Sequence, residues 1–283
     1  MQREKVHHKK RYFGKIVLYA FLIVMVIYTL IPFFTIILTS FRTTKDSVRG
    51  PFTLPQEWDI IGNYAEAWEM GNFSTYLFNS IYMMIFTVAL TLVVATLAGY
   101  SFAKFKYPGK NVLYYILIFS MMIPFQTIML PEYFVLRKLG LLNSLTGVAI
   151  VMTATGIGFA VMMMRSFFVG IPDSMIEAAR IDGCGELKIL TSIILPNTYP
   201  AWSSLIIFVA LGAWNNLLAP MIYIVAEEKY PIPYAMYAFQ DSHGTSYGLM
   251  SAAMMISVLP IAILYLCFAK RFQANIMAGS VKG

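Results

Sequence analysis

Six long apolar runs without a charged residue constrain this chain more than any other feature of its sequence. None of them contains Asp, Glu, Lys, Arg or His, and each has about the 20 residues that a helix needs to cross the hydrocarbon core of a bilayer. Charged residues make up 12% of the chain, about half of the fraction in soluble domains. The sequence therefore predicts an all-α integral membrane protein with six transmembrane helices. The runs cover residues 16–39, 76–103, 112–131, 145–164, 201–226 and 245–269.

The first run follows a basic segment, and a basic start before an apolar run is also typical of a secretory signal peptide. The apolar core of a signal peptide has only ~7–15 residues and ends in small residues. The run 16–39 is longer, and residues 34–41 offer no small-x-small cleavage site. We therefore expect this run to remain in the protein as its first transmembrane helix.

The 21 Lys and Arg residues are distributed unevenly between the segments that connect the runs. If the N-terminus lies in the cytosol, the cytosolic segments hold fifteen of them, and nine of the 14 acidic residues lie outside. Segments rich in Lys and Arg stay in the cytosol, so both termini are expected there. The predicted organisation is a basic cytosolic tail at 1–15, a six-span domain at 16–269 with a cytosolic loop at 165–200, and a cytosolic tail at 270–283. The net charge of +7 suits this orientation better than nucleic-acid binding.

The cytosolic loop 165–200 has stronger local structure signals than a simple connection between spans. Ser174 and Glu177 have the spacing of a capping box at the start of a helix, with Asp173 as an alternative N-cap. Gly183 stands where the end of that helix needs a residue in the left-handed region.

A second short helix is expected in the same loop from Glu186 to Ile194, ended by Pro196. A chain that only joins two spans does not need two helices with defined ends. We interpret the loop as a docking element for another polypeptide. Outside the membrane, Asn63 to Trp68 is expected to form a short helix at the interface, where aromatic side chains settle.

The sequence contains none of the motifs that would make the chain an enzyme on its own. It has no Gly-rich phosphate loop ending in Gly-Lys-Ser/Thr, no Gly-x-Ser-x-Gly and no His-Glu-x-x-His. Its two cysteines, Cys184 and Cys267, have no metal-ligand spacing. The spans also lack the ionisable residues that ion-coupled carriers place inside the bilayer, although backbone carbonyls can bind sodium as well. The expected protein is a transporter subunit without cofactor or metal, driven by another polypeptide through the loop.

Several spans carry polar or helix-breaking residues that are suited to a translocation pathway. Uncharged amides and hydroxyls beside aromatic rings suit a neutral, hydroxyl-rich solute such as a sugar. The same residue types also bridge helices in any membrane bundle. Pro124 is expected to kink the third span and Pro131 to end it, and 214–216 to interrupt the fifth. The candidate pathway residues are Asn79, Ser80, Tyr82, Met122, Gln126, Trp214, Asn215 and Asn216.

The loop also resembles a known family. Glu177-Ala178-Ala179, then Ile181-Asp182-Gly183, then Ile193-x-Leu195-Pro196 is similar to the signature cytoplasmic loop of ABC importer permeases, and more narrowly to their carbohydrate branch, typified by the smaller maltose permease subunit. The departures are small: Ser174, Cys184 and Asn197 stand where other residues are usual. Further similar segments are Asn63-Tyr64, Asn79-Ser80, Ala98 to Ala103, Ile123-Pro124, Trp214 to Asn216 and Gly279 to Gly283.

This resemblance implies a role for the loop and for the C-terminal tail. Glu177 is expected to pair with a basic group in a cleft of an ATP-binding subunit, while Ala178 and Ala179 let the partner surface come close. The implied coupling residues are Ser174, Glu177, Ala178, Ala179, Asp182, Gly183, Leu195 and Pro196. The tail Ser280, Val281, Lys282 and Gly283 is expected to reach the ATP-binding subunits as well.

The resemblance further implies a complex in a prokaryotic inner or plasma membrane. The partners would be a homologous second permease that completes the pathway, two ATP-binding subunits that carry ATP and Mg²⁺, and an extracytoplasmic sugar-binding protein that meets residues 42–75 and 227–247. The substrate would be a sugar or oligosaccharide, and the spans contact membrane lipid. Two alternatives stay open: an ABC permease for another solute class, such as amino acids, peptides or glycerol phosphate, and an ion-coupled secondary transporter. A phosphate ester would favour a basic residue in the pathway, and the runs contain none.

Overall fold

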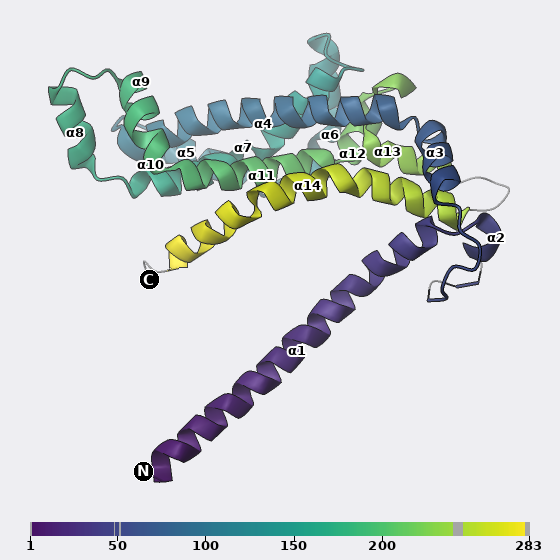
Figure 1. Cartoon of the computed structure of the whole chain (residues 1–283). Helices are drawn as coiled ribbons and strands as arrows, with labels where there is room; N and C mark the ends of the chain where they lie inside the picture. The colour runs from purple at the N-terminus through teal and green to yellow at the C-terminus, as the bar shows by residue number, and fades with distance from the viewer. Residues whose placement is uncertain (1, 48, 51, 240–245, 281–283) are drawn as a thin grey trace. The chain divides into compact units, whose positions relative to one another are not determined.

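The computed structural model describes residues 2–47, 49–50, 52–239 and 246–280, nearly all of them helical. The chain forms two compact units (Figure 1). The first comprises Met1–Gly71 and Ala238–Ile256, and the second comprises Asn72–Tyr237 and Ser257–Gly283. Within these described residues, four helices are long and apolar enough to cross a membrane, and there are up to six spans if each of two bent helix pairs counts as one.

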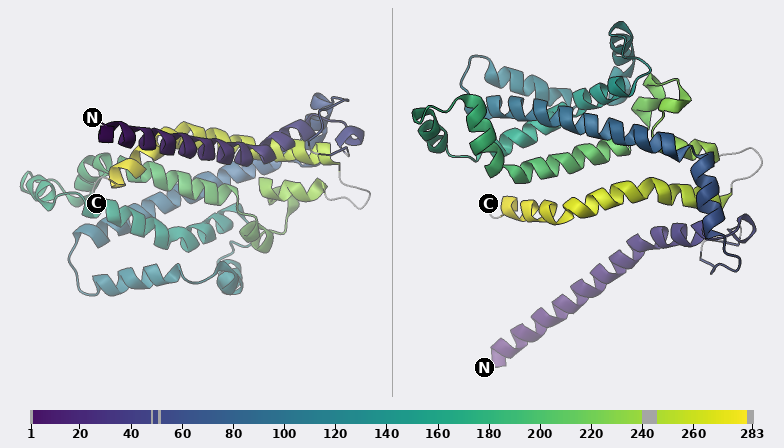
Figure 2. Two further views of the ribbon diagram at one scale, coloured as in Figure 1. Left: turned by 90° about the horizontal axis from the view of Figure 1, so that it is seen from below. Right: turned by 45° about the horizontal axis from the view of Figure 1, so that its top comes forward.

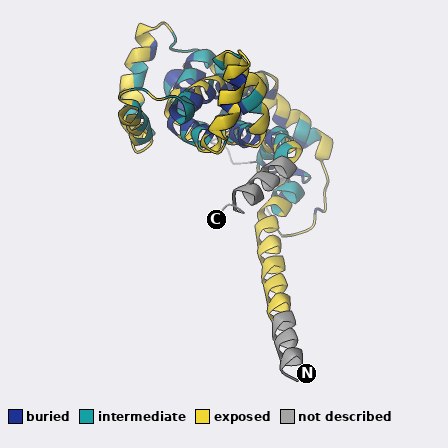
Figure 3. Ribbon diagram, turned by 90° about the vertical axis from the view of Figure 1, so that its left-hand side faces the viewer, coloured by how far each residue is buried: buried dark blue, intermediate teal, exposed yellow. Residues whose placement is uncertain are grey.

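The second unit is built around three helices that pack side by side: α4 (Phe73–Lys104), α7 (Leu145–Val169) and α11 (Tyr199–Trp214) (Figures 1 and 2). Their buried residues face one another inside the unit, with exposed residues around them (Figure 3). Small residues let the backbones approach closely: a Cβ added to Gly99 of α4 would lie 2.9 Å from the Cβ atom of Met164 on α7.

The third predicted span, 112–131, is broken rather than kinked. It consists of α5 (Lys110–Ser120) and α6 (Phe125–Lys138), which are bent by 105° relative to each other. Pro124 lies between them as the N-cap of α6 in an extended conformation, with ψ at 138°. The expectation that Pro131 ends this span is wrong, because Pro131 lies inside α6, which continues to Lys138.

The fifth span is interrupted at the predicted place: α11 ends at Trp214, and α12 (Leu218–Tyr223) follows after a short break. The last helix, α14 (Tyr247–Ser280), continues beyond residue 269 as one helix. The first helix, α1 (Gln2–Ser40), likewise begins within the predicted tail, so neither tail is separated from its span by a loop.

The shorter elements of the second unit lie at its two ends (Figures 1 and 2). The cytosolic loop of the prediction forms α8 and α9 at one end, while α12 and α13 lie at the opposite end. These elements are α8 (Asp173–Ile181), α9 (Glu186–Ile189), a π-helical turn (Leu190–Ile194), α10 (Leu195–Asn197), a 3₁₀ turn (Glu227–Lys229), α13 (Ile232–Ala235) and a second 3₁₀ turn (Met236–Phe239).

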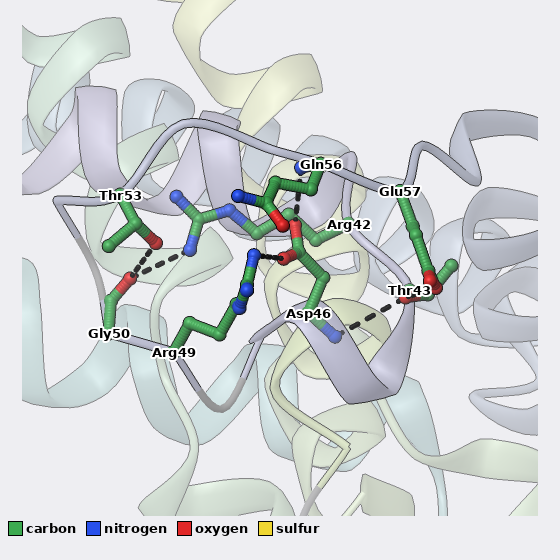
Figure 4. Close-up of polar contacts among 8 residues, drawn as sticks. All are labelled: Arg42, Thr43, Asp46, Arg49, Gly50, Thr53, Gln56 and Glu57. Atoms are coloured by element: carbon green, nitrogen blue, oxygen red, sulfur yellow. Dashed lines mark hydrogen bonds and ion pairs between the residues drawn. The ribbon is translucent and has the colours of Figure 1, made fainter.

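The first unit contains α1, α2 (Thr44–Ser47), α3 (Ile60–Met70) and a loop that folds around a buried arginine (Figure 4). Arg42 is 0% exposed and donates from Nη1 to the carbonyl oxygen of Gly50 at 2.7 Å. Helix α3 confirms that residues 63–68 are helical, while their place at the membrane interface stays a prediction. Asp59 caps this helix by accepting from the Gly62 amide at 3.0 Å.

Asp46 is the second buried charge of this loop (Figure 4). Its carboxylate accepts from the backbone amide of Gln56 at 2.9 Å and contacts the Arg49 guanidinium at 3.4 Å. The Gln56 amide is the main cause that lowers the pKa of Asp46, with smaller contributions from the two arginines. The loop therefore holds an ionised carboxylate next to a buried guanidinium.

Candidate functional site

Helix α8 is the centre of the predicted docking loop, and it divides into two faces. Ile176 is 2% exposed and Ala179 is 7% exposed, and both pack into the hydrophobic core formed by α4, α7 and α11. Glu177, Ala178 and Ile181 are exposed. Side chains three or four positions apart share one face of a helix, so one face holds α8 on the unit and the other is available to a partner.

This division corrects the expected role of Ala179. The resemblance placed Ala178 and Ala179 together at the partner surface, where small side chains allow a close approach. The structure leaves only Ala178 exposed, whereas Ala179 contacts the core of its own chain. The small side chain at 179 therefore serves packing of α8 within the chain.

The N-terminus of α8 is not built as predicted. Pro172 is the N-cap residue, and no side chain caps the helix, so the capping box of Ser174 and Glu177 is not formed. Asp173 does not cap it either, because Lys104 at the end of α4 binds its carboxylate at 2.6 Å. This hydrogen bond and the charge of Lys104 lower the pKa of Asp173.

The C-terminus of α8 ends as the sequence predicts. Gly183 has φ at +77°, in the left-handed region. The Cys184 amide donates to the carbonyl oxygen of Ala179 at 2.9 Å, and the Gly183 amide donates to that of Arg180 at 3.0 Å. This pair of bonds defines a Schellman motif, which turns the chain toward α9. Asp182 is the exposed C-cap residue.

The second helix of the loop is longer than predicted and widens into a π-helical turn. It begins at Glu186 as expected, but Pro196 does not end it, because α10 extends to Asn197. The Leu195 amide donates to the carbonyl oxygen of Leu190, the five-residue bond of a π-helix. The chain then bends by 82° into α11. The widened turn lets the helix pass through a proline that cannot donate a backbone bond.

Three of the candidate pathway residues lie around one cavity of about 440 Å³. Gln126 of α6 lines it together with Asn215 and Asn216, which follow the end of α11. Phe125 and Thr155 add a ring and a hydroxyl to the wall. The remaining residues around it are Val151, Met152, Gly212, Leu217, Leu218 and Ala219. The cavity is therefore lined by uncharged amide, hydroxyl and apolar groups.

Among the residues that the structure describes, no three His, Cys, Asp or Glu side chains come together as a metal site.

Comparison with known proteins identifies the family. A model of the family described as binding-protein-dependent transport system inner membrane component matches residues 92–277, which include α7, the docking loop and α11. The chain belongs to this family.

Individual relatives match nearly the full length of the permease. A diacetylchitobiose uptake system permease protein of Streptomyces coelicolor is 29% identical over 93% of this chain and 88% of its own. An arabinooligosaccharides transport system permease protein of Halalkalibacterium halodurans is 31% identical over 89% of this chain and 91% of its own. A chain in the crystal structure of a bacterial ABC transporter involved in the import of the acidic polysaccharide alginate superposes with a TM-score of 0.82, at 26% identity, covering 93% of this chain and 97% of that chain. The predicted all-α ABC importer permease fold is confirmed, and the permease is a multi-pass membrane protein.

The other candidate pathway residues do not line the cavity. Asn79 is buried and donates to the carbonyl oxygens of Glu228 and Tyr230 at 2.8 and 3.0 Å. Ser80 accepts from the Ile232 amide at 2.8 Å. These two side chains of α4 fix the segment after α12, so the structure gives them a bridging role, and their part in a pathway stays a prediction.

Tyr82, Trp214 and Met122 are also absent from the residues that line the cavity. The hydroxyl of Tyr82 pairs with that of Thr146 at 2.9 Å. Trp214 is 3% exposed and donates from Nε1 to the carbonyl oxygen of Ser257 at 3.2 Å. Met122 is 74% exposed, in the break between α5 and α6. The tail Ser280 to Gly283 is predicted to contact the ATP-binding subunits. Val281 to Gly283 and the side chain of Ser280 lie outside the part of the chain that the structure describes, so this stays a prediction.

Sequence reasoning missed a set of charged and phenolic side chains that anchor the docking loop in the permease. Lys104 and Tyr100 of α4 bind Asp173 and Glu186, and Arg180 binds Glu186 as well. The partners are separated by about 70 to 90 positions in the sequence, apart from Arg180 and Glu186. Only the (i, i+4) spacing of a tyrosine and a lysine at the cytosolic end of a span could have indicated them.

Proposed function

We propose that the chain is one of the two permease subunits of an ATP-driven, binding-protein-dependent importer for a sugar or oligosaccharide. Separate ATP-binding subunits hydrolyse ATP with Mg²⁺, a second permease completes the pathway, and an extracytoplasmic binding protein delivers the substrate. Both termini and the loop that carries α8 face the cytosol, in agreement with the distribution of Lys and Arg.

The main support for this proposal is the exposed side of the docking loop, which faces away from the core of the permease. Ile181 is 86% exposed and Leu187 on α9 is 72% exposed, although each lies in a loop rich in charged residues. Ile181 lies one turn after Glu177 on α8, and Ala178 is exposed as well. Exposed apolar side chains grouped with a charge mark an interaction site. An ATP-binding subunit with a basic group in an apolar cleft is complementary to this surface.

The uncharged cavity supports a neutral substrate. Sugars present hydroxyl groups at their edges and apolar faces to aromatic rings, and amides can donate to and accept from hydroxyl groups. Gln126, Asn215 and Asn216 supply such amides beside Phe125. The two relatives described above are named for import of diacetylchitobiose and arabinooligosaccharides. A permease for a phosphate ester would instead favour a basic residue in this wall.

The docking assignment is tested by reversing one charge. Glu177→Lys is expected to abolish co-purification of the ATP-binding subunit and sugar uptake, because it opposes the basic group of the partner, while the permease still inserts in the membrane. Glu66→Lys makes the same change at an exposed position of α3, on the predicted outer side, and should leave subunit binding unchanged. Full transport by Glu177→Lys would refute the assignment.

The substrate class needs a separate measurement. The complex, reconstituted with its binding protein, is expected to hydrolyse ATP faster when neutral oligosaccharides are added. Stimulation by peptides, amino acids or glycerol phosphate, without any by sugars, would assign the alternative solute class.

A further inference from the structure

Helix α4 holds the docking helix α8 through two side chains that lie one turn apart. Tyr100 and Lys104 are separated by four positions, so they share one face of α4 near its C-terminus. The Lys104 side chain is only 5% exposed. Its ammonium donates to the carbonyl oxygen of Ile171 at 2.5 Å and to the carboxylate of Asp173 at 2.6 Å. This lysine therefore fixes the N-terminal end of α8.

Tyr100 fixes the other end of α8 through a shared carboxylate. Its hydroxyl donates to one oxygen of Glu186 at 2.7 Å, and Arg180 donates from Nε to the other oxygen at 2.8 Å. Arg180 lies in the last turn of α8. The Tyr100 ring is 4% exposed and meets the rings of Phe105 and Phe168 edge-on, which fixes its direction.

The opposite end of α4 is tied to a second segment. There the Asn79 and Ser80 contacts hold the backbone of residues 228–232, as described above. Between these two ends α4 is a single helix of 32 residues, about 48 Å long at 1.5 Å per residue. The third span is broken by a bend of 105°, and the chain bends by 82° between α10 and α11, so these segments are less suited to transmit a displacement along their length.

We propose that Tyr100 and Lys104 are positioning residues that mount the docking helix rigidly on α4, so that α4 carries each displacement of that helix to residues 228–232. The inference rests on the proposed function, because it requires an ATP-binding subunit that moves α8. The apolar contacts of Ile176 and Ala179 hold α8 without a defined direction. Charge-assisted hydrogen bonds at both ends add direction, and two separated anchors prevent the helix from pivoting about one of them.

The proposal is tested in the reconstituted complex with Tyr100→Phe and Lys104→Met, singly and together. The ATP-binding subunits should still co-purify, because the outer face of α8 is unchanged. Stimulation of ATP hydrolysis by the loaded binding protein should fall at least about tenfold in each single variant, the change in equilibrium constant for one lost hydrogen bond to a charged group. Lys104→Met loses the bond to the carbonyl oxygen of Ile171 as well. Uptake should be close to background in the double variant.

Two matched controls remove similar groups that do not join α8 to α4. The hydroxyl of Tyr107 accepts from Ser101 at 3.3 Å, and the ammonium of Lys110 donates to the carbonyl oxygen of Phe105 at 2.8 Å, both around the turn after α4. Tyr107→Phe and Lys110→Met should keep wild-type stimulation. An equal loss in the controls, or unchanged stimulation in the Tyr100 and Lys104 variants, would overturn the proposal.

Nearly isosteric variants test the same anchors if the double variant fails to fold. Asp173→Asn and Glu186→Gln keep the volume of each side chain but remove the ion pairs with Lys104 and Arg180, and they should reduce stimulation while subunit binding persists. Loss of subunit binding in these variants would assign the residues to the docking surface and refute the proposal that they attach α8 to α4. The proposed function fails separately, if the wild-type complex shows no sugar-dependent hydrolysis or if Glu177→Lys transports normally.

Discussion

Ala178 and Ala179 provide the sharpest test of how the docking helix is divided between the permease and its partner. They are adjacent and identical, yet Ala179 is 7% exposed within the core and Ala178 lies on the outer face. Replacing each with Leu adds the same volume to a buried position in one case and to an exposed position in the other. Ala179→Leu should therefore lower the stability of the permease, and Ala178→Leu should weaken docking of the ATP-binding subunit.

The expected size of each effect follows from the burial. Forcing extra carbon atoms into a packed interior costs about 1–3 kcal/mol. A loss of 1 kcal/mol lowers Tm by about 2–4 °C in a domain of 150–250 residues, so Ala179→Leu should lower Tm by about 5 °C. Ala178→Leu should change the free energy of unfolding by less than about 0.5 kcal/mol, because its side chain enters solvent. The same side chain should obstruct the ATP-binding subunit.

Two measurements separate these outcomes. Thermal unfolding of the purified permease in detergent, followed by tryptophan fluorescence, gives Tm, and co-purification of the ATP-binding subunit gives docking. Ala179→Leu is expected to lower Tm, and Ala178→Leu to reduce docking at unchanged Tm. The reasoning is refuted if Ala178→Leu destabilises as much as Ala179→Leu, or if Ala179→Leu abolishes docking without lowering Tm.

Three further predictions concern other contacts of the permease. Asn79→Ala leaves one buried carbonyl oxygen (Tyr230) and one part-buried carbonyl oxygen (Glu228) without their donor and should cost about 1–3 kcal/mol, seen as a lower Tm in detergent; an unchanged Tm would contradict it. Because Lys104 lowers the pKa of Asp173, the ionised carboxylate stabilises the fold above its ordinary pKa of about 4, and this contribution is lost as the pH falls through the lowered value. The Tm difference between wild type and Asp173→Asn should therefore be constant above pH ~4 and narrow below it; a difference that widens on acidification would show the opposite sign. Asn215→Asp places a charge in the cavity wall and should reduce uptake of a neutral sugar more than Asn215→Gln does, as measured with labelled substrate.

Features set by neighbouring residues were predictable from the sequence. The apolar runs give the spans because each helix must satisfy its own backbone within lipid. Gly183 ends α8 in the left-handed region because an αL position after a helix favours glycine. The interruption at Trp214 follows from the polar pair Asn215-Asn216 in an apolar run. Each of these signals acts over a few residues, so no knowledge of tertiary contacts is needed.

Features decided by distant contacts were not predictable in the same way. The spacing of Ser174 and Glu177 fits a capping box, yet Pro172 and the contact of Asp173 with Lys104 set the start of α8. Pro196 suggests a helix end, but a π-helical turn before it lets the helix continue. The spans show that proline alone does not locate a break: Pro124 separates two helices, whereas Pro131 lies within one.

The acidic residues of the docking loop show what the structure adds to the choice of a partner contact. The sequence offers four candidates: Asp173, Glu177, Asp182 and Glu186. The structure engages two of them inside the chain, because Lys104 binds Asp173 while Tyr100 and Arg180 share Glu186. A carboxylate that already anchors α8 would have to give up those bonds to accept a partner's cation. Glu177 instead is exposed one turn from Ile181, and it lines a pocket of about 300 Å³ with Lys104, Lys106 and Arg180, where a group of the partner can reach it. The internal use of Asp173 and Glu186 therefore leaves Glu177 and Asp182 for a partner, and Glu177 is the one of the two that lies within α8.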